Sequence, residues 1–180
     1  MKKSLIVTLA MFVLGSFGVV FGQVDHDVTV DIPEVVTIRF TDGSSRSPVD
    51  TNLDLEFEIT GDAADFAGTY APSNLASRDW ADVQVFQNRD NSWDVTVSVT
   101  GDTGFDWSKI AVTPSGTDAI ASSFNLTASD LEIAAWNDPN ASARGWNSLG
   151  FGPTDFELTL DGTETAGEYS ATVVYTLTAP

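Results

Sequence analysis

Cysteine is absent from the 180-residue chain, and histidine occurs once, at position 26. Without cysteine the protein has no disulfides, no thiol catalysis and no zinc–thiolate sites, so its fold must depend on a hydrophobic core. With one histidine, close to the N-terminus, histidine-dependent catalytic triads and multi-histidine metal sites are excluded. No G-x-S-x-G motif is present either. We therefore expect a nonenzymatic protein.

Basic residues are scarce as well. Eight Lys and Arg stand against 26 Asp and Glu, which gives a formal net charge of −18. Such an acidic surface repels phosphate backbones and anionic lipid head groups, so neither nucleic acid nor a membrane surface is an expected partner. It favours cations instead.

The N-terminus has the pattern of a secretory leader. Lys2 and Lys3 precede an apolar run over residues 5–14, and Val20 and Gly22 stand where a signal peptidase requires small residues. We interpret residues 1–22 as a cleaved signal peptide, with a membrane anchor as the alternative. The mature chain, residues 23–180, is then one domain that is secreted to the extracellular space or the cell envelope.

Helical periodicity is missing, whereas apolar and polar residues alternate along much of the chain. The alternation is clearest at residues 52–60, where Leu53, Leu55, Phe57 and Ile59 share one face. Similar runs occupy residues 28–32, 35–40, 82–88, 92–101, 109–113, 122–127, 154–162 and 168–179. Eight or nine short strands separated by turn residues predict an all-β protein, a single antiparallel β-sandwich of Ig-like or Greek-key type. A closed barrel is the alternative.

The connections between strands suggest how they pair. The compact turn Asn88–Asn91 predicts a hairpin between residues 82–87 and 92–99. The C-terminal strand is expected to close the sandwich by pairing with residues 154–162. Two longer connections, 62–81 and 134–153, each run to roughly 20 residues, which indicates a functional surface or an unrecognised element.

Five tryptophans raise the question of sugar binding. Trp93 alternates in phase with Val95, Val97 and Val99, so we assign it to the core. The others lie in predicted loops or at strand ends and are candidate ligand-binding platforms: Trp80, Trp107, Trp136 and Trp146. Trp136 and Trp146 form the best candidate patch. The alternative is a hydrophobic plug over an open end of the sandwich.

Acidic turn residues are candidate metal ligands. Hard oxygen ligands suit calcium, and the candidates are Asp90, Asp94, Asp102 and Asp106. None has the spacing of a dedicated calcium loop, so solvated turn residues are the alternative. Lys109 is the only lysine beyond the leader. If it were buried beside an asparagine and an acid, it would be placed to close an intramolecular isopeptide bond.

Two stretches, VQVFQNRDNSWDVTVSVTG and AGEYSATVVYTLTAP, resemble the signatures of the WxL family, whose exported β-rich domains attach noncovalently to bacterial cell walls. The positions of the two Trp-x-Leu triplets are occupied here by Trp93, Asp94 and Val95 and by Tyr175, Thr176 and Leu177. Valine replaces leucine in the first triplet, and tyrosine replaces tryptophan in the second. The ending is also similar to the last strand of spore coat U-type and pilus-like subunits, in which a donated strand completes the sandwich.

Together these observations predict a nonenzymatic, adhesin-like structural domain of the bacterial cell envelope or surface. It would act through noncovalent contacts with envelope polysaccharide or with another surface protein. The first alternative is a polysaccharide-binding module that uses the loop tryptophans. The second is a filament subunit, a homo-oligomer in which residues 24–32 serve as the donated strand. Calcium is the only cofactor that the pattern suggests.

Overall fold

The structure is a computed structural model. It describes residues 29–30, 32–43, 47–59, 66–88, 92–101, 103–141 and 144–179. The chain divides into two units, Met1–Pro33 and Glu34–Pro180, and every described strand belongs to the second unit, here called the sandwich. The expected leader lies outside the described residues.

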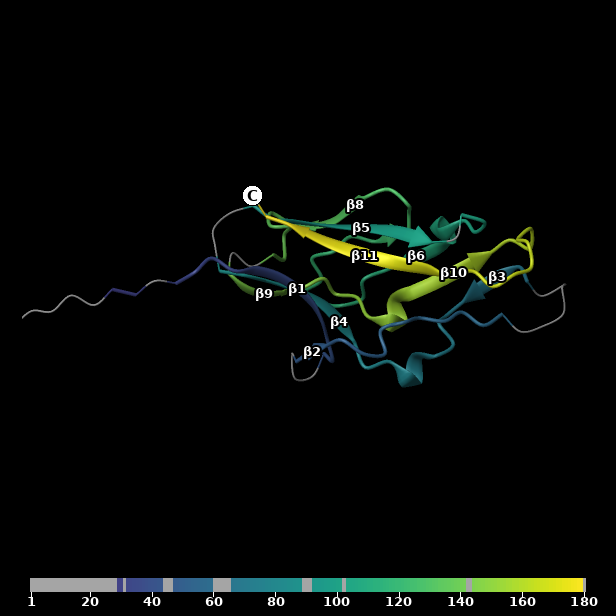
Figure 1. Cartoon of the computed structure of the whole chain (residues 1–180), viewed down its shortest axis with the longest axis horizontal. Coiled ribbons are helices and arrows are strands. Elements are labelled where there is room, and N and C mark those ends of the chain that lie inside the picture. The colour runs from purple at the N-terminus through teal and green to yellow at the C-terminus, as the bar shows by residue number, and fades with distance from the viewer. Residues whose placement is uncertain are drawn as a thin grey trace, which may run out of the picture. The chain divides into compact units, whose positions relative to one another are not determined.

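The described part of the sandwich is built from short strands joined by turns and single-turn 3₁₀ helices (Figure 1). The strands are β1 (Val36–Thr41), β2 (Pro48–Val49), β3 (Gly68–Tyr70), β4 (Asp82–Gln87), β5 (Asp94–Gly101), β6 (Ile110–Val112), β7 (Phe124–Asn125), β8 (Leu131–Ala135), β9 (Gly145–Ser148), β10 (Phe156–Leu160) and β11 (Ala171–Thr178). The 3₁₀ helices are η2 (Leu75–Ser77), η3 (Trp107–Lys109) and η4 (Pro153–Asp155).

These strands form three antiparallel sheets, in the orders β2-β1-β4-β9, β3-β10-β6-β7 and β11-β5-β8. Figure 1 shows β8, β5 and β11 in one layer, with β1, β4 and β9 in the layer opposite. In the described part of the chain each sheet ends in an edge strand and does not close on itself. The predicted all-β antiparallel sandwich is confirmed.

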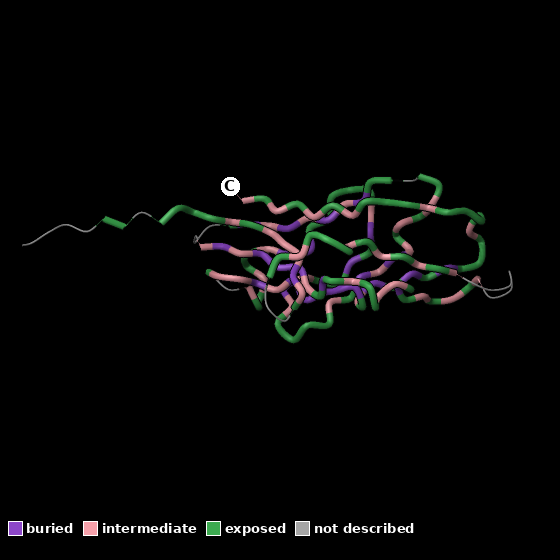
Figure 2. Tube along the Cα trace, turned by 60° about the horizontal axis from the view of Figure 1, so that its bottom comes forward, coloured by how far each residue is buried: buried purple, intermediate pink, exposed green. Residues whose placement is uncertain are grey.

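One hydrophobic core lies between the sheets, as the buried positions in Figure 2 show. Strand β5 buries Val95, Val97 and Val99 and leaves the residues between them half-buried, which is the period-two pattern of a strand with one face inside. Trp93, just before this strand, is 1% exposed, so its prediction as a core residue is confirmed. Burying each such valine contributes roughly 1.5–3 kcal/mol.

Both predicted strand pairings are wrong. Strand β4 pairs with β1 and β9, whereas β5 pairs with β11 and β8, so the connection at Asn88–Asn91 leads from one sheet to another. Strand β10 pairs with β3 and β6, and β11 pairs with β5, from Ala171 opposite Gly101 to Thr178 opposite Asp94. The alternation of apolar and polar residues predicts which face of a strand is buried. It does not predict the neighbouring strand, because the strands of both facing sheets bury an apolar face.

The segment Leu53–Ile59 keeps its predicted alternation of half-buried and exposed residues but is not a strand. Its backbone bonds to a loop instead: the amide of Ser73 donates to the carbonyl of Glu56 at 2.7 Å, and the Trp80 indole donates to the carbonyl of Leu53 at 3.0 Å. Both long connections contain elements that the sequence did not reveal. The first includes β3 and η2, and the second includes β9.

Candidate functional site

A groove with a volume of about 270 Å³ opens between β1 and β11. It is lined by Ile38, Arg39, Phe40, Val83, Val173, Val174 and Tyr175. Strands β1 and β11 belong to different sheets, so the groove lies where the edge of one sheet faces the edge of the other. We call it the edge groove.

Both walls of the edge groove are strand edges without a strand partner in the described part of the chain. Strand β11 pairs only with β5, so its other edge is open over all eight residues. On β1, the two-residue strand β2 covers only Phe40 and Thr41, and the edge from Val36 to Arg39 stays open. Open edges present backbone N–H and C=O groups that are suited to pairing with another strand.

Strand β11 lacks the features that usually protect a sheet edge. Such edges are kept from pairing by charged residues, proline, bulges or very short length. The sequence ATVVYTLT has no charge and no proline, and its pairing with β5 runs without a register shift. It is also as long as any other strand described here. The composition of β11 therefore favours pairing.

The floor of the edge groove is apolar and rich in aromatic rings. Phe40 meets Tyr175 edge to face with ring centroids 5.9 Å apart, and Phe151 lies 5.9 Å from the same tyrosine on the core side. Burial raises the pKa of Tyr175. No hydrogen bond to its hydroxyl is found among the described residues. A polar group that is desolvated in this way gains from a partner that brings a donor or an acceptor.

A fixed positive charge lies on the outer face of the sheet that contains β1. Ile38 and Phe40 pack against the core, so the alternation of β1 places Arg39 on its outer face. The Arg39 guanidinium lies 3.4 Å from the centroid of the Trp146 ring and donates to Gln84 Oε1 at 3.3 Å. These partners belong to β9 and β4, so the charge is held on the side of β1 that faces away from its open edge.

The structure brings together the two triplets that carry the family resemblance. The first ends in β5 and the second lies in β11, and the two strands are neighbours. Val95 stands directly opposite Leu177, and Asp94 opposite Thr178. Tyr175 has its ring on the floor of the edge groove. Tyr175 is thus the residue of the two triplets that lines the groove.

The four candidate ligand-binding tryptophans are dispersed. Trp80 is 5% exposed and meets Phe40 edge to face at 5.0 Å, so it is a core residue and offers no face to a sugar. Trp146 packs on Phe86 at 5.0 Å and is covered by the arginine described above. Trp136 is 49% exposed. No ring contact joins Trp136 to Trp146 in the described residues, so the expected patch is not assembled as a stacked pair.

Trp107 lies in a second hollow, of about 310 Å³, near the end of β5. Phe105 meets its ring at 4.9 Å and the Tyr169 ring at 5.3 Å. Beside it, Asp106 accepts hydrogen bonds from the backbone and the hydroxyl of Ser108, at 3.1 and 2.6 Å, and these bonds lower the pKa of the Asp106 carboxyl. The hollow thus combines aromatic rings with a carboxylate and hydroxyl groups.

The structure describes two of the four candidate calcium ligands. Asp90 and Asp102 lie outside the described residues. Asp94 begins β5, whereas Asp106 follows the other end of that strand, so these two carboxylates do not face one another. In the part of the chain that the structure describes, no group of three metal-ligating side chains is found. Calcium binding stays a prediction.

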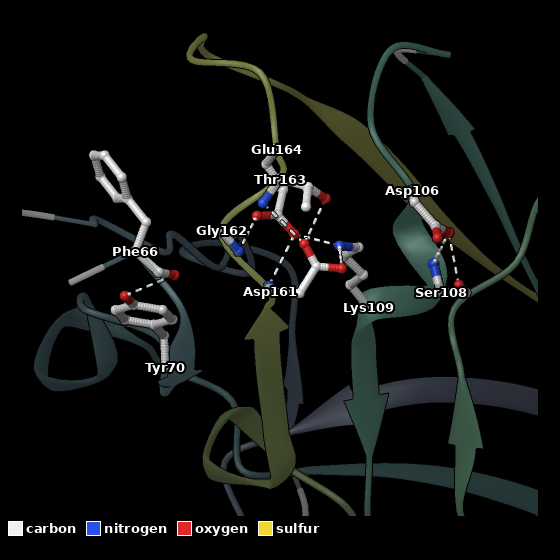
Figure 3. Close-up of polar contacts among 9 residues, drawn as sticks. All are labelled: Phe66, Tyr70, Asp106, Ser108, Lys109, Asp161, Gly162, Thr163 and Glu164. Atoms are coloured by element: carbon white, nitrogen blue, oxygen red, sulfur yellow. Dashed lines mark hydrogen bonds and ion pairs between the residues drawn. The ribbon is translucent and has the colours of Figure 1, made fainter. Parts of the chain in front are cut away.

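Lys109 forms an ion-pair cluster at the end of β10 (Figure 3). Its Nζ lies 3.0 Å from Asp161 Oδ2 and also contacts Glu164. The backbone and hydroxyl of Thr163 donate to Asp161 at 2.9 and 2.5 Å, and the amide of Gly162 donates to Glu164 at 3.0 Å. The loop after β10 is thus folded around the lysine.

The electrostatics of this cluster are those of an ion pair. Hydrogen bonds to Glu164 and then to Asp161 raise the pKa of Lys109. Hydrogen bonds from Thr163 lower the pKa of Asp161, and the bond from Lys109 lowers that of Glu164. Closing an isopeptide bond requires a neutral amine. These shifts instead favour the charged amine beside charged carboxylates.

Among the described residues no helix is both long and apolar enough to cross a membrane. Comparison of the chain with protein-family models, with curated proteins and with solved structures finds no match.

Proposed function

We propose that this protein is an exported, nonenzymatic structural domain of the bacterial cell envelope or surface that works by noncovalent association. The edge groove is the observation that supports this function. It offers two open strand edges over an apolar floor, which suit binding by backbone hydrogen bonds and burial. Its lining contains no carboxylate, histidine, lysine or serine, so it holds no pair of groups suited to proton transfer or nucleophilic attack.

Export and bacterial origin are supported by sequence features. The residues 1–22 have the charge and apolar pattern of a leader. The two triplets of the WxL resemblance lie on neighbouring strands, where Val95 stands opposite Leu177. Envelope polysaccharide and other surface proteins are the partner classes that this resemblance implies.

Fractionation of a bacterial host that expresses the full chain tests the proposal. We expect the protein in the envelope fraction, shortened by its leader, and released intact by urea because no covalent link holds it. A chain without residues 1–22 should stay in the cytoplasm and serves as the control. Recovery of the full chain in the cytoplasm, or in the medium without affinity for added envelopes, would contradict the proposal.

The hollow beside Trp107 favours a second function, polysaccharide binding. An indole face with neighbouring hydroxyl and carboxylate groups is suited to stacking on a sugar ring and bonding its hydroxyls. Calorimetric titration with a panel of glycans should then give binding that Trp107→Ala abolishes. Trp136→Ala, which removes an exposed indole elsewhere, is the matched control. If no glycan binds, this second function is wrong.

A further inference from the structure

The edge groove has the properties of a site for one missing strand. Its two walls are the open edges of β1 and β11, and its floor is lined by half-buried apolar side chains from both. A strand laid along β11 would pair with an edge of eight residues. Every second side chain of that strand would then cover the floor, since side chains alternate between faces.

The chain contains a segment with the pattern that this site requires. Residues 24–32 read VDHDVTVDI, with Val28, Val30 and Ile32 on one parity and only acids and threonine on the other. Val30 and Ile32 are each 73% exposed, more than any other large hydrophobic side chain described. Exposed aliphatic side chains at alternate positions are typical of a strand that is buried on assembly.

The apolar and acidic sides of the segment determine which side faces the groove. A strand with its valines on the floor turns its other parity outward, toward solvent. That parity includes Asp25, Asp27 and Asp31. The reverse orientation would bury these acids over an apolar floor, which is unfavourable.

The position of Val35 argues that the segment comes from another molecule. The amide of Val35 donates to Asn88 Oδ1 at 2.7 Å, and the amide of Asn88 donates to the Val35 carbonyl at 3.2 Å. These bonds keep the chain extended beside the end of β4 as it enters β1. To reach the groove of its own sandwich, the segment would have to reverse just before Val35 and disrupt this clamp.

We propose that the edge groove binds residues 24–32 of a second copy of this chain. The inference rests on the proposed noncovalent function and names its partner. Each copy then carries both a donor segment and an acceptor groove. Because the two surfaces differ, the contact is head to tail and generates open linear assemblies, not closed pairs.

Charge variants at adjacent donor positions test the assignment. Val30→Asp places a carboxylate on the floor of the groove, whereas Thr29→Asp adds the same charge on the outward parity. By sedimentation of the full chain and its secreted form, we expect wild type and Thr29→Asp to assemble with rising concentration, and Val30→Asp to associate at least about tenfold more weakly. Since Val30 is exposed, all three should melt at the same temperature at concentrations too low for assembly. Equal association of both variants would overturn the proposal.

Two further measurements locate the acceptor. A synthetic peptide of residues 24–33 should bind one-to-one to the Val30→Asp protein, whose groove is empty, and the same peptide with Val30→Asp should not.

Because the chain has no cysteine, Thr29→Cys combined with Val174→Cys should give disulfide-linked ladders. Thr29→Cys combined with Thr159→Cys, on the doubly paired strand β10, should not. Ladders from both pairs would overturn the assignment to the groove.

The outcomes separate this inference from the proposed function. If wild type is a monomer and the Val30→Asp protein does not bind the peptide, strand donation is overturned. Envelope attachment of that monomer would then leave the proposed function standing. A wild-type monomer together with peptide binding by Val30→Asp means that the segment fills its own groove, which overturns the second copy. Linear assembly without any envelope attachment supports the inference and contradicts the proposed function.

Discussion

At the scale of single residues, a glycine fixes one close approach between loops. Gly150 has φ +84°, and a Cβ there would lie 2.1 Å from the Cβ of Ala119. Gly145 also has a positive φ, +100°, but a Cβ there would meet nothing within 4 Å. Comparing alanine substitutions at these two glycines therefore separates the cost of backbone strain from the cost of steric overlap.

We expect Gly145→Ala to lower the free energy of unfolding by about 1–2 kcal/mol, the cost of a left-handed conformation for a residue with a Cβ. Gly150→Ala should cost that amount plus roughly 1–3 kcal/mol for displacing its neighbour. Urea unfolding of both variants measures the difference. Equal losses would show that the loop at Ala119 moves away without cost.

The ion-pair cluster of Lys109 predicts a dependence of stability on pH. The pKa values of Asp161 and Glu164 lie below their ordinary 3.8 and 4.5, so their contribution is present above those values and is lost as the pH falls through the lowered ones. The pKa of Lys109 lies above 10.5, so its contribution is present below that value and is lost at higher pH. Stabilisation is therefore greatest between the two limits.

Lys109→Gln should lower the melting temperature near neutral pH, and the difference from wild type should shrink toward pH 2 as the carboxylates are protonated. The effect should be small because Asp161 is exposed to solvent. Lys109→Arg keeps the charge and is the control. A difference that stays constant across this pH range would contradict an ionic origin.

At the scale of elements, the sequence predicted which side of each strand is buried but not which strands are neighbours. Val95, Val97 and Val99 are buried as their alternation indicates, and the residues from Leu53 to Ile59 alternate as expected. Alternation reports the face because solvent and core lie on opposite sides of a strand. The pairing of β5 with β11 depends on the topology of the whole chain, which no local pattern contains.

The candidate site was likewise only partly predictable from the sequence. The terminal strand and the alternating segment before Pro33 were both recognisable from sequence, but the groove exists because β1 and β11, from different sheets, come together. Trp80 and Trp146 were placed in loops or at strand ends by sequence. Trp80 is buried by the aromatic core and Trp146 is covered by Arg39, which are tertiary effects without a local signal. The short strands β3 and β9 begin with glycine and show no alternation long enough to detect.

One asparagine side chain makes two of the hydrogen bonds that hold the unpaired segment Leu53–Ile59 to its loop. Asn74 accepts from the amide of Glu56 at 3.1 Å and donates to the carbonyl of Asp54 at 3.2 Å, so it replaces part of a neighbouring strand. Asn74→Ala should raise the hydrogen-exchange rate of the Glu56 amide and lower stability by about 1–2 kcal/mol for two lost bonds. Ser73→Ala is the control, since it removes a hydroxyl bond to the Glu56 carbonyl but leaves the Ser73 amide bond to that carbonyl and the Asn74 bond to the Glu56 amide in place. Unchanged exchange in Asn74→Ala would show that the other bonds and the packing hold the segment without Asn74.

At the scale of the whole molecule, the acidity of the chain and its open edge act in opposite directions. Every copy carries a formal net charge of −18, so two copies repel one another over the Debye length of the solution. The uncharged edge of β11 and the exposed valine and isoleucine of the donor segment favour contact at short range. This repulsion resists disordered aggregation through the open edge but is overcome where a strand fits the groove.

Salt therefore distinguishes apolar strand insertion from ionic association. Raising sodium chloride from roughly 0.01 M to 1 M shortens the Debye length from about 30 Å to about 3 Å, which removes the repulsion between copies and leaves burial of Val30 and Ile32 intact. We expect the association constant of wild type, measured by sedimentation, to rise over this range, while Val30→Asp stays weakly associated throughout. Association that falls as salt rises would mean that ion pairs hold the copies together, and that the open edges of β1 and β11 are not the binding surface.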